Sequence, residues 1–396
     1  MANVSSSNGL EKRPKLRFPG FDEPWKKCEF KEFAEVNPKC QSIPEQFYYI
    51  DLGSVEDGEL SNAKIENALS APSRAQRLLS CNDVLFQTVR PYQQNNYLFC
   101  EERSLPTVAS TGYAVFRTEY DVPFLYALIH TGHFLNSVLS RCTGTSFPAV
   151  SASDIEDILV SIPSLGEQQK IGELFGLLNS KIRKQKALIE SLKKYKRGLL
   201  HKVFLQSRRS NWGRKCLQEI ASFTGGGTPS KDVASYWNGT IAWISSSDLQ
   251  EDWIDTISIT RRITTDAIEN SATKICPKGS IAIVSRVGVG KVAIMPEELC
   301  TSQDFINVTA IAGNTRFMAY QIAYKMKVEA ARTQGTSIKG ITTDTIKSLE
   351  VDIPSDEEQE YLARMLSAFD SILHCEIHQL DALVKQRRAL LQQIFT

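Results

Sequence analysis

GTSFPAVSASDIEDILVSIPSLGEQQKI (residues 144–171) and GTSIKGITTDTIKSLEVDIPSDEEQEYL (residues 335–362) are two versions of one segment in the same chain. They align without a gap, and the alignment continues to residues 204 and 395. Both contain GTS, an IPS tripeptide and an EQ pair. Self-similarity at a fixed offset indicates one structural unit used twice, and this period is too long for a solenoid. We therefore expect two repeats, each the size of a domain.

The likeness extends upstream more weakly. A tryptophan opens each half, Trp25 and Trp212, and an apolar run typical of a β-strand ends on Arg90 and on Arg286. The first part of each half is strand-rich and differs between the halves, whereas the last part is helical and alike. The sequence thus predicts an α+β fold with an internal repeat. The predicted parts are a flexible tail at 1–15, globular domains at 16–160 and 208–351, and helical regions at 161–207 and 352–396.

The helical part of each half starts after Pro163 or Pro354. A serine then precedes a glutamate by three residues, which is the form of a capping box. Apolar residues recur with spacings of four and three, as in a heptad seam. The predicted seam residues are Ile171, Phe175, Leu178, Ile182, Ile189, Leu192, Leu199 and Val203 in the first helix and Leu362, Leu366, Phe369, Leu373, Leu380, Leu383, Leu390 and Ile394 in the second.

Polar residues interrupt the two seams at equivalent places, first at Gln185 and Glu376 and then at Lys196 and Arg387. A helix of about 40 residues spans about 60 Å and cannot bury such a seam alone. The matched interruptions favour pairing of the two helices with each other, and packing of each helix on its own domain is the alternative. If the pair is antiparallel, the domains lie at opposite ends, related by a pseudo-twofold axis; if it is parallel, both lie at one end.

This layout resembles the specificity (S) subunits of type I restriction-modification systems, which have two target recognition domains and two conserved helical regions. The likeness covers nearly the whole chain. It includes the opening LRFPGF at 16–21, GGGTPS at 225–230, WIS at 243–245, the paired segments quoted above and the long helices. The resemblance implies an antiparallel coiled coil that holds the recognition domains apart, and a reader of double-stranded DNA without catalysis of its own.

The resemblance also implies partners. Two methyltransferase (M) subunits dock on the helices and methylate adenine N6, and restriction (R) subunits add nuclease and translocase activity. S-adenosylmethionine is then expected in the M subunits, ATP and Mg in the R subunits, and no cofactor or metal in this chain. No apolar run approaches the about 20 residues of a membrane span, and no signal peptide opens the chain. With nine scattered cysteines and no CxxC motif, we expect a cytoplasmic protein with free thiols and no membrane partner.

Because the first parts of the halves differ, we expect two different half-sites, and hence a bipartite, asymmetric target whose spacer is set by the helices. In the first half, RPYQQNNY at 90–97 follows an apolar strand and concentrates guanidinium and amide groups that read base edges. A plain turn is the alternative. The predicted DNA-binding residues of this half are Arg90, Tyr92, Gln93, Gln94 and Asn95, together with Arg74 and Arg77.

In the second half, three polar loops are candidates: GGGTPSK at 225–231, SSSD at 245–248 and RVGVGK at 286–291. Glycines in such loops let backbone N–H groups approach phosphate. The predicted contacts are Thr228, Ser230, Lys231, Ser246, Ser247, Arg286 and Lys291. At the junctions of domain and helix, phosphate anchoring and simple packing are equally good interpretations for Thr145, Ser146, Thr336, Ser337 and Lys339.

Lysine and arginine crowd residues 181–202, where the only acid is Glu190. A solvated helix face is one interpretation. The phosphates of spacer DNA, or the acidic surface of a partner, are the others.

No catalytic motif is present. SRVGVGKV has Ser285 and Val292 where a phosphate-binding loop needs Gly and Ser or Thr. His374 and His378 stand four residues apart on the second helix but lack the glutamate of HExxH, so we interpret them as helix residues. The alternatives to a DNA reader are a coiled-coil scaffold that presents two β-rich protein-binding domains, and a fragment of an enzyme. The target bases, the spacer length and whether the allele is active or silent stay open.

Overall fold

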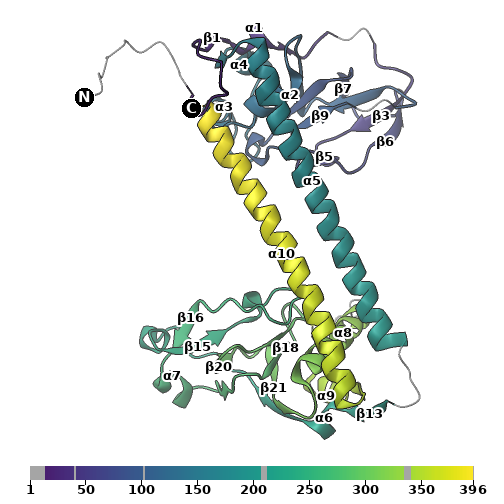
Figure 1. The fold of residues 1–396 in the computed structure, drawn as a ribbon, viewed down its shortest axis with the longest axis vertical. Helices are drawn as coiled ribbons and strands as arrows, with labels where there is room; N and C mark the ends of the chain where they lie inside the picture. The colour runs from purple at the N-terminus through teal and green to yellow at the C-terminus, as the bar shows by residue number, and fades with distance from the viewer. Residues whose placement is uncertain (1–13, 40–41, 101–102, 207–211, 334–339, 396) are drawn as a thin grey trace. The chain divides into compact units, whose positions relative to one another are not determined.

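The structure, a computed structural model, describes residues 14–39, 42–100, 103–206, 212–333 and 340–395 (Figure 1). The predicted site residues Thr336, Ser337 and Lys339, and most of the predicted tail, lie outside the described residues. The chain divides into two compact units: unit 1 comprises Met1–Lys186 and Gln379–Thr396, and unit 2 comprises Ala187–His378. Each unit therefore contains the beginning of one long helix and the end of the other, namely α5 (Leu165–His201) and α10 (Asp356–Phe395).

Unit 1 contains two four-stranded sheets. The first has the order β6 (Lys64–Asn67), β3 (Gln46–Ile50), β10 (Thr107–Ser110), β7 (Ala75–Leu78). The second has the order β2 (Glu35–Val36), β11 (Tyr113–Arg117), β8 (Asp83–Gln87), β9 (Tyr97–Phe99). Only β3 and β10 run parallel in these sheets. The remaining elements are β1 (Lys26–Glu29), β4 (Val55–Glu56), β5 (Glu59–Leu60), β12 (Leu159–Ile162), α1 (Phe30–Phe33), α2 (Val122–Leu128), α3 (Gly132–Leu139), α4 (Ala152–Glu156) and the 3-10 turn η1 (Pro91–Gln93).

Unit 2 repeats this plan with two four-stranded sheets. One has the order β14 (Ala221–Gly225), β21 (Phe305–Ile311), β18 (Ile281–Val284), β19 (Val292–Ile294). The other has the order β16 (Arg261–Ile263), β15 (Ile241–Ile244), β20 (Leu299–Thr301), β17 (Ile275–Cys276), with β15 and β20 parallel. The remaining elements are β13 (Gly213–Cys216), β22 (Glu350–Ile353), α6 (Leu217–Ile220), α7 (Thr265–Glu269), α8 (Thr315–Thr333), α9 (Thr343–Lys347), the 3-10 turns η3 (Ala234–Trp237) and η4 (Ser246–Asp248), and the π-helical end of α5, η2 (Lys202–Gln206).

The landmarks of the sequence repeat hold the same positions in both units. The indole N–H of Trp25 donates to Glu167 over 3.2 Å, and that of Trp212 donates to Glu358 over 3.0 Å. The first strand of each half pairs antiparallel with the strand just before the long helix, β1 with β12 and β13 with β22. The EQ pair therefore ties the start of each long helix to the first strand of its half. Its glutamines, Gln168 and Gln359, donate to the carbonyls of the preceding prolines.

The two long helices are antiparallel within each unit (α5 teal and α10 yellow in Figure 1). In unit 1 the end of α10 packs beside the start of α5, with the rings of Phe175 and Phe395 6.2 Å apart. In unit 2 the end of α5 packs beside the start of α10, with the rings of Tyr195 and Phe369 5.4 Å apart. The predicted fold class, an α+β repeat with an antiparallel coiled coil, is confirmed.

The predicted seam residues are buried or half-buried. The buried ones are Ile171, Phe175, Leu178, Leu383 and Ile394 in unit 1 and Ile189, Val203, Leu366 and Leu373 in unit 2. The half-buried ones are Ile182, Leu380 and Leu390 in unit 1 and Leu192, Leu199, Leu362 and Phe369 in unit 2. Among the helices that the structure describes, none is long and apolar enough to cross a membrane.

The second polar interruption is built differently in the two units. In unit 2, the Lys196 ammonium lies 2.5 Å from the carboxylate of Asp370, which accepts a hydrogen bond of 2.7 Å from the Tyr320 hydroxyl. Lys196 also donates to the carbonyl of Asp252 over 2.6 Å. In unit 1, burial lowers the pKa of Arg387, and Tyr126 and Asp57 partly offset this effect. A lysine in a buried ion pair thus stands where the other unit has a half-buried arginine that interacts electrostatically with Tyr126 and Asp57.

Candidate nucleic-acid interface

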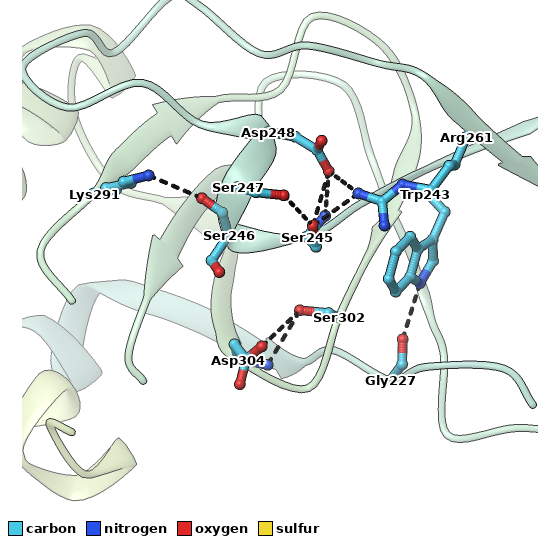
Figure 2. Close-up of polar contacts among 10 residues, drawn as sticks. All are labelled: Gly227, Trp243, Ser245, Ser246, Ser247, Asp248, Arg261, Lys291, Ser302 and Asp304. Carbon is cyan, nitrogen blue, oxygen red and sulfur yellow. Dashed lines mark hydrogen bonds and ion pairs between the residues drawn. The ribbon is translucent and has the colours of Figure 1, made fainter. Parts of the chain in front are cut away.

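Three strands of unit 2 end, and a fourth begins, at one edge of its two sheets. Ile244 at the end of β15 lies opposite Thr301 at the end of β20, and Val284 at the end of β18 lies opposite Phe305. The segment 302–304 joins the two sheets at this edge, since it connects β20 to β21; Ser302 N donates to Ile244 O over 2.9 Å in one sheet, and Asp304 O accepts from Ser285 N over 2.8 Å in the other. We call the loops gathered here, residues 225–231, 245–248, 285–291 and 302–304, the unit 2 loop end (Figure 2). All three loops predicted from the sequence belong to it.

The glycine-rich loop of this end is tightly packed against its neighbours. A Cβ on Gly226 would collide with the carbonyl oxygen of Ser302, and one on Gly227 would collide with the backbone of Thr273. Gly227 donates its N–H to Thr301 O over 2.8 Å and accepts from the indole of Trp243 over 3.0 Å. These glycines therefore permit the close approach of the loop backbone to neighbouring segments.

Lys291 supports its neighbouring turn from within the loop end. Its ammonium donates to Ser246 O over 3.1 Å and to Leu249 O over 2.9 Å. Arg286, from the same loop, is exposed and has no hydrogen-bond or ion-pair partner in the part of the chain that the structure describes. The other predicted residues here divide into the exposed Ser230, Lys231 and Ser247 and the half-buried Thr228 and Ser246.

Unit 1 has the equivalent loop end. Gln87 at the end of β8 lies opposite Tyr113, and Ser110 at the end of β10 lies opposite Ala75. Arg74 O accepts from Thr111 N over 2.8 Å. The exposed Arg74 and the loop at 88–96 therefore share one edge of the sheets. We call residues 74–75, 88–96, 110–113 and 143–149 the unit 1 loop end.

Arg90 joins two parts of this loop end that are far apart in the sequence. Its N–H donates to Pro148 O over 2.7 Å, and its guanidinium lies 4.4 Å from the ring centroid of Phe147. This contact brings the exposed Thr145 and Ser146 beside Arg90. Phe147 is 64% exposed and was not among the predicted residues, although an aromatic side chain in a GTSFP turn is a usable signal for such a site.

The buried Gln87 fixes the conformation of the Arg90 loop. Its amide nitrogen donates to Val89 O over 2.8 Å and to Gln93 Oε1 over 2.7 Å, and its oxygen accepts from Asn95 N over 3.2 Å. Gln93 thus has one polar atom engaged within the loop. The side-chain oxygen of Asn95 accepts from Asp57 N over 3.3 Å. Hydrogen bonds within the loop therefore fix its backbone, while side chains such as Gln93 stay exposed.

Three further predicted residues of unit 1 have distinct environments. Tyr92 is 52% exposed. Gln94 is half-buried and adopts a left-handed backbone conformation with φ 53°. Arg77 lies within β7 opposite Ala109, and burial lowers its pKa.

The basic segment of α5 is partly neutralised. Lys186 pairs with Asp57 over 2.8 Å, Lys193 pairs with Glu190 over 2.8 Å, and Lys196 pairs with Asp370. The exposed basic residues of the segment are Lys181, Arg183, Lys184, Lys194, Arg197 and Lys202. Both interpretations of this charge, a solvated face and a surface for phosphates or a partner, stay open.

Three histidines differ in their surroundings. His374 stacks on Trp253 with ring centroids 3.8 Å apart. His130 lies in the turn after α2, and the exposed His133 lies in α3. Among the described residues, no group of three His, Cys, Asp or Glu side chains is placed to hold a metal ion.

Two α+β units share one architecture and each has its own loop end, so the chain is a duplicated protein built on two long helices. Residues 23–194 and 209–384 each match the family described as Type I restriction modification DNA specificity domain, and the chain belongs to this family. The membership predicted from the sequence is confirmed.

The curated relatives carry the same kind of name. The specificity subunit of the type I restriction enzyme MjaIX from Methanocaldococcus jannaschii is 32% identical over 179 residues, which cover 44% of this chain and 41% of that protein. The specificity subunit of EcoR124I/EcoR124II from Escherichia coli is 30% identical over 167 residues, which cover 40% of this chain and 41% of that protein. The chain thus spans about two fifths of the length of these relatives.

Solved structures show the same fold over nearly the whole chain. The S subunit of a type I restriction-modification system from M. genitalium has a TM-score of 0.62 at 14% identity and covers 97% of this chain and 99% of that chain. A chain from a study of complex assembly and conformational transition of the type I R-M system has a TM-score of 0.61 at 18% identity and covers 96% and 99%. At these identities the likeness shows the fold alone.

Proposed function

We propose that this chain is the DNA-specificity subunit of a type I restriction-modification complex and recognises a bipartite, asymmetric DNA target. The observation that carries the proposal is one specificity domain matched twice, with a differently built loop end on each copy. Two recognition domains in one chain suit a DNA target with two separate half-sites. Because the loop ends differ in their residues, the half-sites differ in their bases.

The proposed DNA contacts are the accessible residues of the two loop ends. Arginine and amide side chains read base edges, and arginine, lysine, hydroxyl and backbone N–H groups anchor phosphates. In unit 1 we assign Arg74, Arg90, Tyr92, Gln93, Gln94, Thr145 and Ser146, and in unit 2 Thr228, Ser230, Lys231, Ser246, Ser247 and Arg286. Asn95 and Lys291 shape these ends through their hydrogen bonds.

The proposed partners are two M subunits and, through them, R subunits. The long helices expose large apolar side chains that are available for such docking. Leu177 of α5 in unit 1 and Tyr361 of α10 in unit 2 are each 66% exposed. The M subunits would supply S-adenosylmethionine and the R subunits ATP and Mg, while this chain supplies no catalysis and works in the cytoplasm, where the DNA is. The naming of the relatives disfavours the non-DNA scaffold.

The test is a map of N6-methyladenine in cells that co-express this chain with its M subunit. A bipartite motif with a fixed gap is the expected result. Arg90→Ala should relax one half-site only, because Arg90 belongs to the unit 1 loop end. Arg103→Ala is the matched control, since Arg103 stacks on Tyr48 and precedes β10 at the opposite edge of the sheet.

Two results would count against the proposal. A stable complex that adds no methylation motif would favour the scaffold. Equal loss at both half-sites in Arg90→Ala would contradict the assignment of the Arg90 loop to one half-site.

A further inference from the structure

In each unit, the second polar interruption of the helix seams meets an aspartate turn of the domain. The interrupting cations are Arg387 in unit 1 and Lys196 in unit 2. Asp57 interacts electrostatically with Arg387, and Asp252 O accepts from the Lys196 ammonium over 2.6 Å. Both aspartates follow a glutamate and have left-handed backbone conformations, with φ 52° and 69°. This conformation is uncommon in residues other than glycine, so its presence beside the cation of both units indicates a shared role.

In unit 1, Asp57 joins the helix pair to the Arg90 loop (residues 90–96). Its carboxylate lies 2.8 Å from the Lys186 ammonium of α5, in addition to its interaction with Arg387 of α10. Its N–H donates to the side-chain oxygen of Asn95 over 3.3 Å. The N–H of Asn95 donates to the side-chain oxygen of Gln87, which fixes the loop. One residue therefore contacts the helix pair and the proposed DNA-binding loop.

Gly58 packs the same turn against a second part of the loop. Asp57 and Gly58 form the tip of the β4–β5 hairpin. A Cβ on Gly58 would lie 2.7 Å from the Tyr126 hydroxyl, which donates to Asn96 O over 3.1 Å. Asn96 is buried, and its side-chain oxygen accepts from Gln87 N over 2.9 Å. The hairpin tip thus fits closely between the domain and the loop, and a larger residue than glycine would displace it.

Unit 2 has an equivalent link made of different groups. Lys291 of the loop at 286–291, here called the Arg286 loop, donates to Ser246 O over 3.1 Å (Figure 2) and to Leu249 O over 2.9 Å. The segment that carries these carbonyls continues to Asp252, whose carbonyl accepts from Lys196. Lys196 is buried in the helix pair. One chain segment therefore contacts the Arg286 loop at one end and the helix pair at the other.

These links give the polar interruptions a purpose. A polar residue in a helix seam costs stability and is retained where it provides specificity. A binding loop keeps its discrimination only when neighbouring hydrogen bonds hold it within about 0.5 Å of the productive position. An apolar residue at either seam position would offer no donor to the domain, whereas Arg387 and Lys196 attract the segment that holds the loop.

We infer that the cations of the helix pair position the proposed DNA-binding loop of their own unit, with Asp57 as the positioning residue of the Arg90 loop and Lys196 as that of the Arg286 loop. The inference rests on the proposed function and assigns residues that act on the DNA target through these loops.

The experiment uses the complete complex of this chain with its M subunit. Methylation is measured on the mapped motif and on variants of that motif with each base replaced in turn, and thermal denaturation checks that each complex is folded. Asp57→Asn keeps the backbone N–H and suits a left-handed conformation, but it removes the charge that pairs with Lys186. Discrimination at the half-site contacted by unit 1 should fall about 2- to 5-fold, as expected for the loss of an exposed ion pair.

Gly58→Ala is a second variant with a larger expected effect. It should reduce discrimination at the same half-site about 10-fold, because the added Cβ displaces the turn from the Tyr126 hydroxyl. Glu59→Gln is the matched control, since it removes one negative charge from the same hairpin. Glu59 is exposed and has no hydrogen-bond or ion-pair partner among the described residues, so the whole motif should stay intact.

Two further variants separate positioning from a general effect on the fold. Lys196→Gln removes the ammonium from Asp252 O and should relax only the half-site contacted by unit 2. The double variant Asp57→Asn, Lys186→Gln should lose no more discrimination than Asp57→Asn alone, since both changes remove the same ion pair.

Three results would overturn the inference. They are an unchanged half-site preference in both Asp57→Asn and Gly58→Ala, equal relaxation of both half-sites in either variant, and fully additive losses in the double variant. A wild-type complex with no bipartite motif would instead overturn the proposed function itself.

Discussion

The two units share the contacts that position the long helices and differ in the contacts within their loop ends. Trp25 with Glu167, and Trp212 with Glu358, make the same contact at the start of each long helix. The loop ends are stabilised by different means. Unit 1 uses the neutral amide of Gln87, and unit 2 uses the ammonium of Lys291 on backbone carbonyls. The duplicated residues therefore maintain the architecture, and the residues that diverge between the copies build the two loop ends.

A second difference lies within the helix pair. Unit 2 buries a charged pair, Lys196 and Asp370, whose side chains are 7% and 6% exposed. The residue of unit 1 that aligns with Asp370 is Asn179, which is half-buried. A buried ion pair contributes little net stability but is costly to break. The two units should therefore respond unequally to equivalent substitutions.

The largest expected effect tests this inequality. Asp370→Ala should lower the free energy of unfolding of unit 2 by about 3–5 kcal/mol, because Lys196 is left buried without its counter-charge. Asn179→Ala should cost about 1 kcal/mol or less. The measurement is urea denaturation followed by tryptophan fluorescence, since Trp25 reports on unit 1 and Trp212, Trp237, Trp243 and Trp253 report on unit 2. Equal losses in the two variants would contradict the difference between the units.

A smaller effect, confined to unit 1, comes from pH. Burial lowers the pKa of His130 to about 4, and the nearby Arg387 adds to the shift, while Nδ1 lies 2.7 Å from Tyr126 O. The folded pKa is below the unfolded value of 6.5, so stability is complete above pH 6.5 and falls as the pH drops toward 4. We expect a loss of about 1–2 kcal/mol between pH 7 and pH 5.

His130→Gln should remove this pH dependence, and His133→Gln, which changes an exposed histidine on the neighbouring helix, should keep it. Denaturation curves at both pH values compare the three proteins. A pH dependence that persists in His130→Gln would show that another group is responsible.

The sequence predicted the parts of this fold that depend on local periodicity. The apolar seams of the two long helices were predicted from residue spacing alone, and their residues are buried or half-buried in the structure. The sequence did not single out α8, because Phe317, Met318, Ala319, Tyr320 and Ile322 are all buried and no single apolar stripe marks the helix. The EQ pair was recognised as a landmark, but its partner Trp25 lies far away in the sequence.

Contacts between distant segments also limited what could be predicted of the site. The sequence predicted Lys291 as a DNA contact, and the structure shows that its ammonium donates to Ser246 O and Leu249 O in another loop. In the sequence, Arg261 is only the first of two consecutive arginines. Its contact with the Trp243 ring is seen only in the folded protein. Residue type identifies candidate contacts, but the packing of strand ends decides which candidates remain available.

The smallest expected effect distinguishes two roles within one loop of unit 2. Lys291 stabilises the loop, whereas Arg286 is the proposed DNA contact. Lys291→Met should cost about 1 kcal/mol of stability, because two carbonyls lose a charged donor. It should leave the salt dependence of DNA binding unchanged, since that ammonium is already engaged. Arg286→Ala should leave stability unchanged and, as a phosphate contact, reduce the slope of log affinity against log salt by about 1. Binding measured across a salt series with the intact complex compares the two variants. A reduced slope in Lys291→Met would show that Lys291 contacts DNA. The unit 2 loop end would then be stabilised by the hydrogen bonds of Asp248 and Trp243.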